Sequence, residues 1–146
     1  MFRLTLIGFI ALSITSTLIY FMVTKSLGLN DVKIAAIEKM TTSIISDLER
    51  AMPLIEEAGY QISSVEAELS IPPEVTTAFE LEKVVPHEKQ KKLLKALDGN
   101  AIGKLVLGSL MQAFTLEKSI SIKDMKMKTI EITISLPPFV TIEYEK

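Results

Sequence analysis

The sequence predicts an α+β fold: an N-terminal transmembrane helix followed by a single domain whose helices pack on a mainly antiparallel sheet. Three observations lead to this prediction. An uncharged apolar run lies near the start of the chain, amphipathic segments alternate with segments of period two, and one strand-like stretch occurs twice. Apolar residues three and four apart indicate a helix, whereas strict alternation indicates a half-buried strand.

The repeated stretch covers residues 65–79, and its second copy covers residues 130–144, at an offset of 65 without a gap. Each copy contains a Pro-Pro pair at the same place, and each follows a one-residue slip in the apolar phase. A shared slip predicts a shared β-bulge, because one extra residue turns every later side chain to the other face. The slips fall across Ser63-Ser64 and Lys128-Thr129, and the proline pairs are Pro72-Pro73 and Pro137-Pro138.

The repeat extends upstream into a helix, because Ala36 and Ile37 match Ala101 and Ile102 at the same offset. We therefore predict two tandem helix-plus-strands repeats, the first over about residues 32-84 and the second over about residues 87-146. The alternative is two independent strands that each stop at a diproline, since proline supplies no hydrogen-bond donor to a sheet.

Composition excludes several kinds of site. The 146 residues suffice for one domain, the formal net charge is −2, and the chain has no Cys, no Trp and one His, His87. Without Cys there are no disulfides, thiolate metal sites or cysteine catalysis, and the balanced charge gives no basic footprint for nucleic acid. Glycine-rich phosphate loops, nucleophile elbows and metal-binding His pairs are absent from the sequence. We therefore expect no enzyme activity, no cofactor and no metal site.

Residues 4–23 carry no charge, and as a helix they would rise about 30 Å, the thickness of a hydrocarbon core. A cleaved signal peptide is the alternative. Its apolar region would be about 7 to 15 residues long and would end at a small-x-small site, which residues 24–28 do not provide. We predict an uncleaved membrane anchor helix in residues 1-25 and a juxtamembrane link in residues 26-31.

The orientation of this anchor follows from its short N-terminal tail, which carries Arg3. Positive charge beside a membrane helix tends to stay in the cytoplasm, although Lys25 and Lys33 on the other side weaken the bias. We expect a single-pass protein of the inner (cell) membrane with its C-terminal domain, residues 32-146, in the periplasm or otherwise outside the cytoplasm.

The first repeat begins with a helix and continues into two strands. Residues 32–58 carry a helical stripe of apolar side chains, in which Pro53 is expected to kink or break the helix and Gly59 to end it. Residues 60–71 alternate as a strand up to the first diproline, and alternation resumes over residues 75–81.

The second repeat follows a short, lysine-rich helix over residues 87–97. Residues 98–100 indicate a turn and a helix cap. Residues 101–114 are the most apolar segment after the anchor, and they predict a core helix because they are too short to span a membrane. Gly103 and Gly108 within this helix predict close packing.

Residues 117–127, with Ile120 and Ile122 apolar, are expected to begin the last strand region, with a turn or bulge at Asp124. Glu66 and Glu131 take equivalent positions in the two copies, opposite the apolar residues, so we expect them to face solvent. The alternative is a carboxylate pair related by pseudo-twofold symmetry.

The short helix supplies the one set of candidate site residues: Lys89, Lys91, Lys92 and Lys95, which we predict as contacts for anionic lipid headgroups. Each Lys near an anionic membrane surface contributes about 1 kcal/mol to binding. The alternative is an ordinary solvated helix face.

These features predict a membrane-anchored, non-enzymatic envelope domain that binds an unknown partner protein or supports an assembly at the membrane surface. The alternative is a tethered domain that binds lipid or another apolar ligand between helices and sheet, and in outline the chain resembles membrane-anchored lipid-handling proteins. Copurified lipid would favour the second function.

Overall fold

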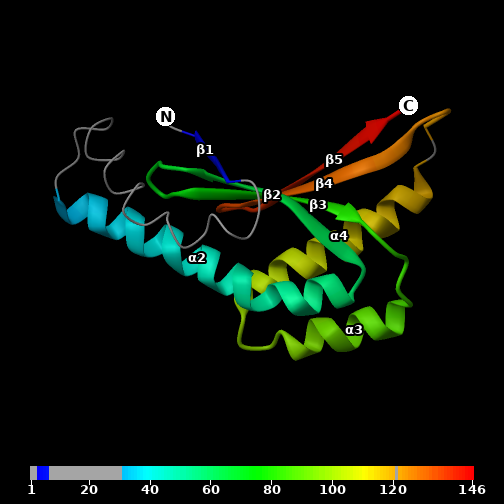
Figure 1. Ribbon diagram of the computed structural model, residues 1–146, viewed down its shortest axis with the longest axis horizontal. Coiled ribbons are helices and arrows are strands. Elements are labelled where there is room, and N and C mark those ends of the chain that lie inside the picture. The colour runs from blue at the N-terminus through cyan, green and yellow to red at the C-terminus, as the bar shows by residue number, and fades with distance from the viewer. Residues whose placement is uncertain (1–2, 7–30, 121) are drawn as a thin grey trace.

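The structure is a computed structural model that describes residues 3–6, 31–120 and 122–146. It confirms the α+β class, with helices packed on an antiparallel sheet (Figure 1). In chain order the elements are β1 (Arg3–Leu6), α2 (Asp31–Glu57), β2 (Tyr60–Glu68), β3 (Glu74–Leu81), α3 (His87–Ala96), α4 (Ala101–Ser119), β4 (Lys126–Ile134) and β5 (Phe139–Glu145).

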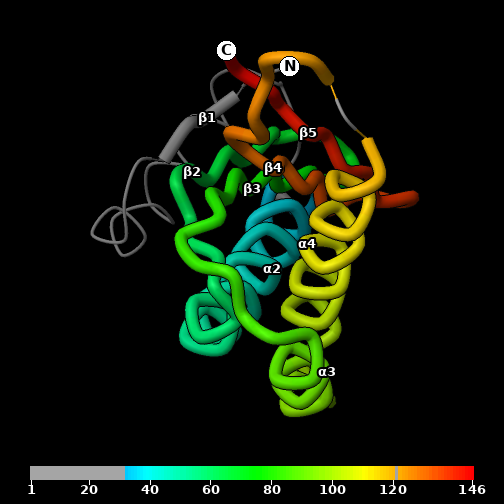
Figure 2. The backbone as a smooth tube through the Cα atoms, turned by 90° about the vertical axis from the view of Figure 1, so that its right-hand side faces the viewer, coloured from blue at the N-terminus to red at the C-terminus, as the bar shows by residue number. Residues whose placement is uncertain are grey.

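The described elements form three layers. The sheet has the strand order β1-β2-β3-β4-β5, and every neighbouring pair is antiparallel. Helices α2 and α4 lie side by side on one face of this sheet, and α3 lies beyond them, on their side away from the sheet (Figure 2). The core therefore lies between the two long helices and the sheet, where α2 and α4 bury one face each.

Two groups of elements have the same organisation. The first unit is α2, β2 and β3, and the second unit is α4, β4 and β5. Each unit places a β-bulge at the position of the predicted phase slip, between Ile62 and Ser64 in β2 and between Met127 and Thr129 in β4. Both bulge predictions are confirmed, and the bulges lie 65 residues apart.

The diproline segments are the connections of two equivalent hairpins. In the first, the Ser70 hydroxyl donates to the Pro72 carbonyl oxygen at 2.7 Å, and in the second Ser135 donates to Pro137 at 2.8 Å. The peptide bonds before Pro72 and Pro137 are both cis. Because β2 and β4 run in the same direction with β3 between them, the units are related by a step of two strands along the sheet rather than by a twofold axis.

Helix α2 confirms the predicted first helix; of the kink or break expected at Pro53, the break does not occur. The helix runs through Pro53 as one element, although this residue supplies no amide donor to the Glu49 carbonyl. The fully buried side chains around the proline, Met52 and Ile55, anchor this part of the helix to the core and offset the missing bond.

Helix α4 is longer than predicted and ends at Ser119, so the predicted strand start near residue 117 is wrong. The last turn of the helix replaces the first part of that strand, and β4 begins at Lys126. The predicted cap is confirmed, because the Asn100 side chain accepts a hydrogen bond from the Gly103 amide at 2.8 Å. The predicted turn at Asp124 is also confirmed, since this residue has a φ of 61°.

Close packing is confirmed at Gly103 and not at Gly108. A Cβ on Gly103 would lie 2.4 Å from the Cβ of Ala51 in α2, so the two helices approach each other through these small residues. A Cβ on Gly108 would meet nothing nearer than Leu94, at 3.9 Å. Gly108 therefore leaves room for a Cβ, which would make an ordinary van der Waals contact with α3.

The core is joined to α3 by a buried tyrosine. The Tyr60 hydroxyl donates to the Leu110 carbonyl oxygen at 3.4 Å and accepts from the Gln90 side-chain amide at 3.5 Å. Gln90 also donates to the Ala58 carbonyl oxygen at 3.0 Å. These contacts connect the start of β2 with both α3 and α4, so the hydroxyl is satisfied although the ring is fully buried.

Tyr60 makes stability depend on pH in the alkaline range. Burial raises the pKa of its hydroxyl above the ordinary value of about 10, and the hydrogen bond from Gln90 partly opposes the rise. A raised pKa in the folded state means that the contribution is present below pH about 10 and is lost as the pH rises through the folded pKa. We expect the urea midpoint to fall more steeply above pH about 10 in the parent than in Tyr60→Phe; parallel pH profiles would contradict this assignment.

The predicted membrane helix lies mostly outside the described residues. Residues 3–6 belong instead to β1, whose alternation of apolar and polar residues suits a strand paired with β2. Residues 7–23 lie outside the description, so the membrane anchor stays a prediction. None of the helices that the structure describes combines the length and the apolar character needed to cross a bilayer.

Candidate functional site: an open flank on the second unit

Five positions that are fully buried in the first unit are only partly covered in the second. In the first unit these positions are fully buried, and they are occupied by Ala51, Ile55, Val75, Thr77 and Phe79. At an offset of 65 the second unit has Leu116, Ile120, Val140, Ile142 and Tyr144. Leu116 is 50% exposed, Ile120 42% and Val140 41%, while Ile142 and Tyr144 are half-buried. We call these five residues, Leu116 of α4, Ile120 directly after it and three residues of β5, the open flank.

The strand and helix order explains the difference. In the first unit, Ala51 lies on the side of α2 that packs against Gly103 of α4, and β3 is a central strand between β2 and β4. In the second unit, β5 is the edge of the sheet, and no described helix lies beyond α4 (Figure 2). The apolar residues of the open flank therefore lack the helix and strand that cover their counterparts.

The opposite side of the domain is closed. There the edge of β2 is paired with β1, and the outer surface of α2 carries small and polar side chains. A shallow groove of about 500 Å³ on this surface is lined by Ala35, Glu38, Lys39, Thr42, Ser43 and Ser46. Stacked units normally end in a polar surface of this kind, because an apolar end would lie open to water. The domain thus has one polar end and one apolar end.

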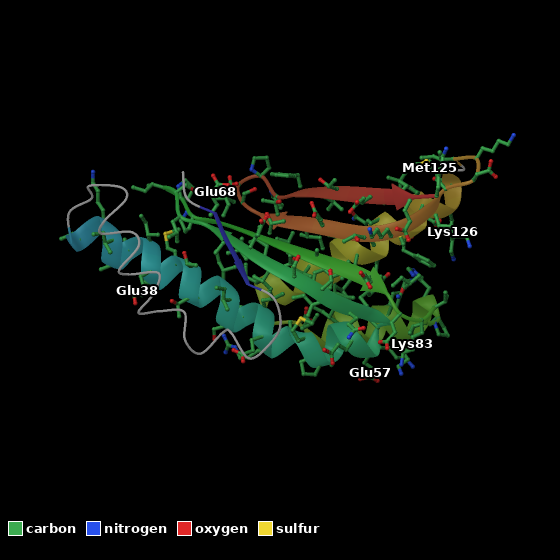
Figure 3. The ribbon with its side chains drawn as sticks, turned by 45° about the horizontal axis from the view of Figure 1, so that its top comes forward. Glu38, Glu57, Glu68, Lys83, Met125 and Lys126 are labelled. Carbon is green, nitrogen blue, oxygen red and sulfur yellow. The ribbon has the colours of Figure 1, made fainter. Side chains whose placement is uncertain are left out.

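The second hairpin connection adds to the apolar end. Leu136, beside Pro137, is 90% exposed, and its counterpart Ile71 in the first hairpin is 63% exposed. Phe139 at the start of β5 is 55% exposed, where the first unit has Glu74. The first proline of each pair is exposed in both hairpins, whereas Pro73 is buried and its counterpart Pro138 is exposed. Both connections lie at one end of the sheet, where Figure 3 labels Glu68, and Lys126 marks the opposite end.

The predicted headgroup contacts lie on α3, and two of the four lysines are paired with carboxylates. Lys89 lies 3.1 Å from Glu57, at the end of α2, and Lys91 lies 3.4 Å from Glu88. Lys92 and Lys95 are exposed. Figure 1 places α3 beside the C-terminal half of α2, away from the end at which α2 begins. The headgroup contact stays a prediction, and no other feature of the site depends on it.

Glu66 and Glu131 do not form a carboxylate pair. They lie on β2 and β4, with β3 between them, and they pair with different residues of that strand, Thr76 and Ala78. Both carboxylates are half-buried on the face of the sheet away from the helices. On the same face the Thr76 and Thr133 hydroxyls lie 2.9 Å apart and hydrogen-bond across β3 and β4.

A second groove, between α3 and α4, could hold a small apolar group. It has a volume of about 500 Å³, it is open to solvent, and it is lined by His87, Leu94, Gly108, Met111, Gln112, Thr115, Leu116 and Ser119. Most of its exposed surface is apolar, and Leu116 belongs both to this groove and to the open flank. Among the residues that the structure describes, no group of three or more His, Asp or Glu side chains is placed to hold a metal ion.

The fold and the open flank define a class of protein: an α+β domain of two helix-and-hairpin units with one polar end and one apolar end. The chain matches no known protein-family model, and no curated protein or solved structure is significantly similar to it.

Proposed function

We propose that this chain is a membrane-tethered, non-enzymatic domain that binds another protein through the open flank and supports an assembly at the membrane surface. The proposal treats the two units as copies of one repeat. It places the domain outside the cytoplasm, behind an anchor in residues 1-25, so that residues 3–6 enter the membrane instead of pairing with β2 as β1. The observation that carries it is the contrast between five buried positions in the first unit and their open counterparts in the second.

Burying the open flank against another protein would be energetically favourable. Full burial of a large apolar side chain stabilises by about 1.5 to 3 kcal/mol, and the open flank holds Leu116, Ile120 and Val140 about half uncovered. An edge strand with free backbone groups also accepts a further strand readily. A contiguous apolar surface beside a free strand edge is typical of a protein interface.

The test is photo-crosslinking in native membranes with the full chain. A photoreactive residue at Leu116 is expected to give a protein adduct, whereas the same residue at Ser43, on the polar surface of α2, is expected to give none. Both positions are exposed on long helices, so they differ mainly in the surface around them. Equal adducts from the two positions, or no protein adduct from Leu116, would contradict the proposal.

The groove between α3 and α4 supports the alternative function, the binding of lipid or another apolar ligand. Leu94, Met111 and Leu116 give it an apolar lining, and it is open enough to admit an acyl chain from the side. In the same crosslinking experiment a lipid adduct at Leu116, with copurified lipid in the extract detected by mass spectrometry, would favour this function over protein binding.

A further inference from the structure

We infer that the open flank binds the open flank of a second copy of this chain, with β5 pairing antiparallel to its counterpart and α4 packing on its counterpart. The two copies are related by a twofold axis perpendicular to the sheet. Their two sheets join at β5 into one continuous sheet. The inference rests on the proposed function, because a flank that binds no protein binds no second copy.

The two ends of the domain decide how copies can meet. Head-to-tail stacking would place the open flank against the outer side of α2 and β2, where α2 presents a polar surface. In such a stack β5 would pair with β2 of the next copy in the register in which β3 pairs with β4. Since Ala78 lies opposite Glu131 in that register, Glu143 would lie opposite Glu66. Like charges directly opposite each other destabilise a strand pair. Pairing of two open flanks avoids both problems and stops at two copies.

The sequence of β5 is self-complementary in the register centred on Ile142. If Ile142 lies opposite Ile142 of the second copy, Val140 lies opposite Tyr144, and all three apolar residues meet on the helix side of the sheet. On the other side Glu143 lies opposite Thr141, so no two carboxylates face each other. A register centred on Glu143 would oppose two carboxylates, which disfavours it.

The helices fit the same arrangement. In the domain, α2 and α4 each cover their own two strands, so their axes are separated by two strands, or about 9.6 Å. Continuing the sheet from β5 to β5 separates the two α4 helices by the same two strands. This distance lies in the range of about 8 to 10 Å at which helices pack, and it brings Leu116 and Ile120 into the new seam.

The symmetry is compatible with membrane tethering. With a twofold axis perpendicular to the sheet, both copies turn the same face of the sheet toward a bilayer that lies parallel to the sheet. The starts of the two α2 helices then lie at opposite ends of the pair, as Figure 1 places α2 along the long axis of the domain. Each N-terminal segment can therefore enter the same membrane separately.

The test is disulfide trapping with the full chain in membranes, since the chain contains no natural Cys. In Ile142→Cys the two thiols lie directly across the strand pair, where opposite Cα atoms are about 4.5 to 5.5 Å apart, within disulfide range. In Val140→Cys the two thiols are four residues out of register, roughly 14 Å apart. We expect about tenfold more disulfide-linked dimer from Ile142→Cys than from Val140→Cys under mild oxidation.

Mixing chains gives a matched control. Val140→Cys and Tyr144→Cys should each give little dimer alone and a disulfide-linked heterodimer together, because these residues oppose each other in the inferred register. Equal dimer from Ile142→Cys and Val140→Cys, or none from either, would overturn the inference. If the Leu116 crosslink then contains a different protein, the proposed function stands without the second copy. If Leu116 gives no protein adduct either, both fail.

Discussion

Replacing Leu110 with aspartate is expected to leave the domain unfolded at 25 °C. Leu110 is fully buried in the core cluster between α2, α4 and the sheet, and its carbonyl oxygen accepts the Tyr60 hydrogen bond. Removing a buried leucine side chain to alanine costs about 2 to 5 kcal/mol. An unpaired carboxylate in the same place adds a desolvation cost of several kcal/mol. The sum is comparable to the whole stability of a small domain, about 5 to 15 kcal/mol.

The measurement is the far-ultraviolet circular dichroism of the purified full chain as a function of temperature. Gln112→Asp is the control, because Gln112 is exposed on the same helix and receives the same new side chain. We expect the control to change the free energy of unfolding by about 0.5 kcal/mol or less. Leu105, which is only half-buried, should tolerate aspartate better than Leu110 does. A Leu110→Asp variant that melts within a few degrees of the parent would show that α4 is not part of the core.

The sequence predicted the parts of the fold that depend on local pattern. Alternation and helical periodicity located the strands and the helices, because burial on one face imposes those periods wherever the element lies. The phase slips at Ser63-Ser64 and Lys128-Thr129 located two bulges, since only an extra residue keeps the same face apolar on both sides of a slip. The diprolines indicated interruptions, but whether the chain bent or reversed there depended on strand pairing.

The sequence could not predict the open flank either, because its exposure also depends on strand pairing. Val75 and Val140 are the same residue at the same place in the alternation, yet one is fully buried and the other is 41% exposed. Their environments differ because β3 is central and β5 is an edge, and strand order is set by contacts far apart in the chain. The apolar residues after residue 115 gave a misleading signal, because Leu116 and Ile120 fit both a strand and the exposed side of a helix.

Replacing Gly59 with alanine is expected to cost about 3 kcal/mol or more. Gly59 ends α2 with a φ of +101°, a conformation that costs an L side chain about 1 to 2 kcal/mol. A Cβ would also lie 2.1 Å from the Lys83 carbonyl oxygen, far inside van der Waals contact. The backbone cannot easily retreat, because the Gly59 carbonyl oxygen accepts from the Glu82 amide at 2.9 Å and from the Lys83 amide at 3.3 Å. Backbone shifts forced by overpacking add about 1 to 3 kcal/mol.

Gly99→Ala separates the two contributions, and urea denaturation of both variants measures them. Gly99 has a similar φ of +92°, but a Cβ there would meet nothing within 4 Å. It should therefore show the conformational cost alone, about 1 to 2 kcal/mol. Equal losses in the two variants would mean that the Lys83 carbonyl is not in contact with the end of α2.

The counterpart of Gly59 is Asp124, with a φ of 61°, so each unit turns from helix to strand through a left-handed residue. The turn of the first unit lies against the Lys83 carbonyl closely enough to require glycine, whereas Asp124 in the second unit is exposed.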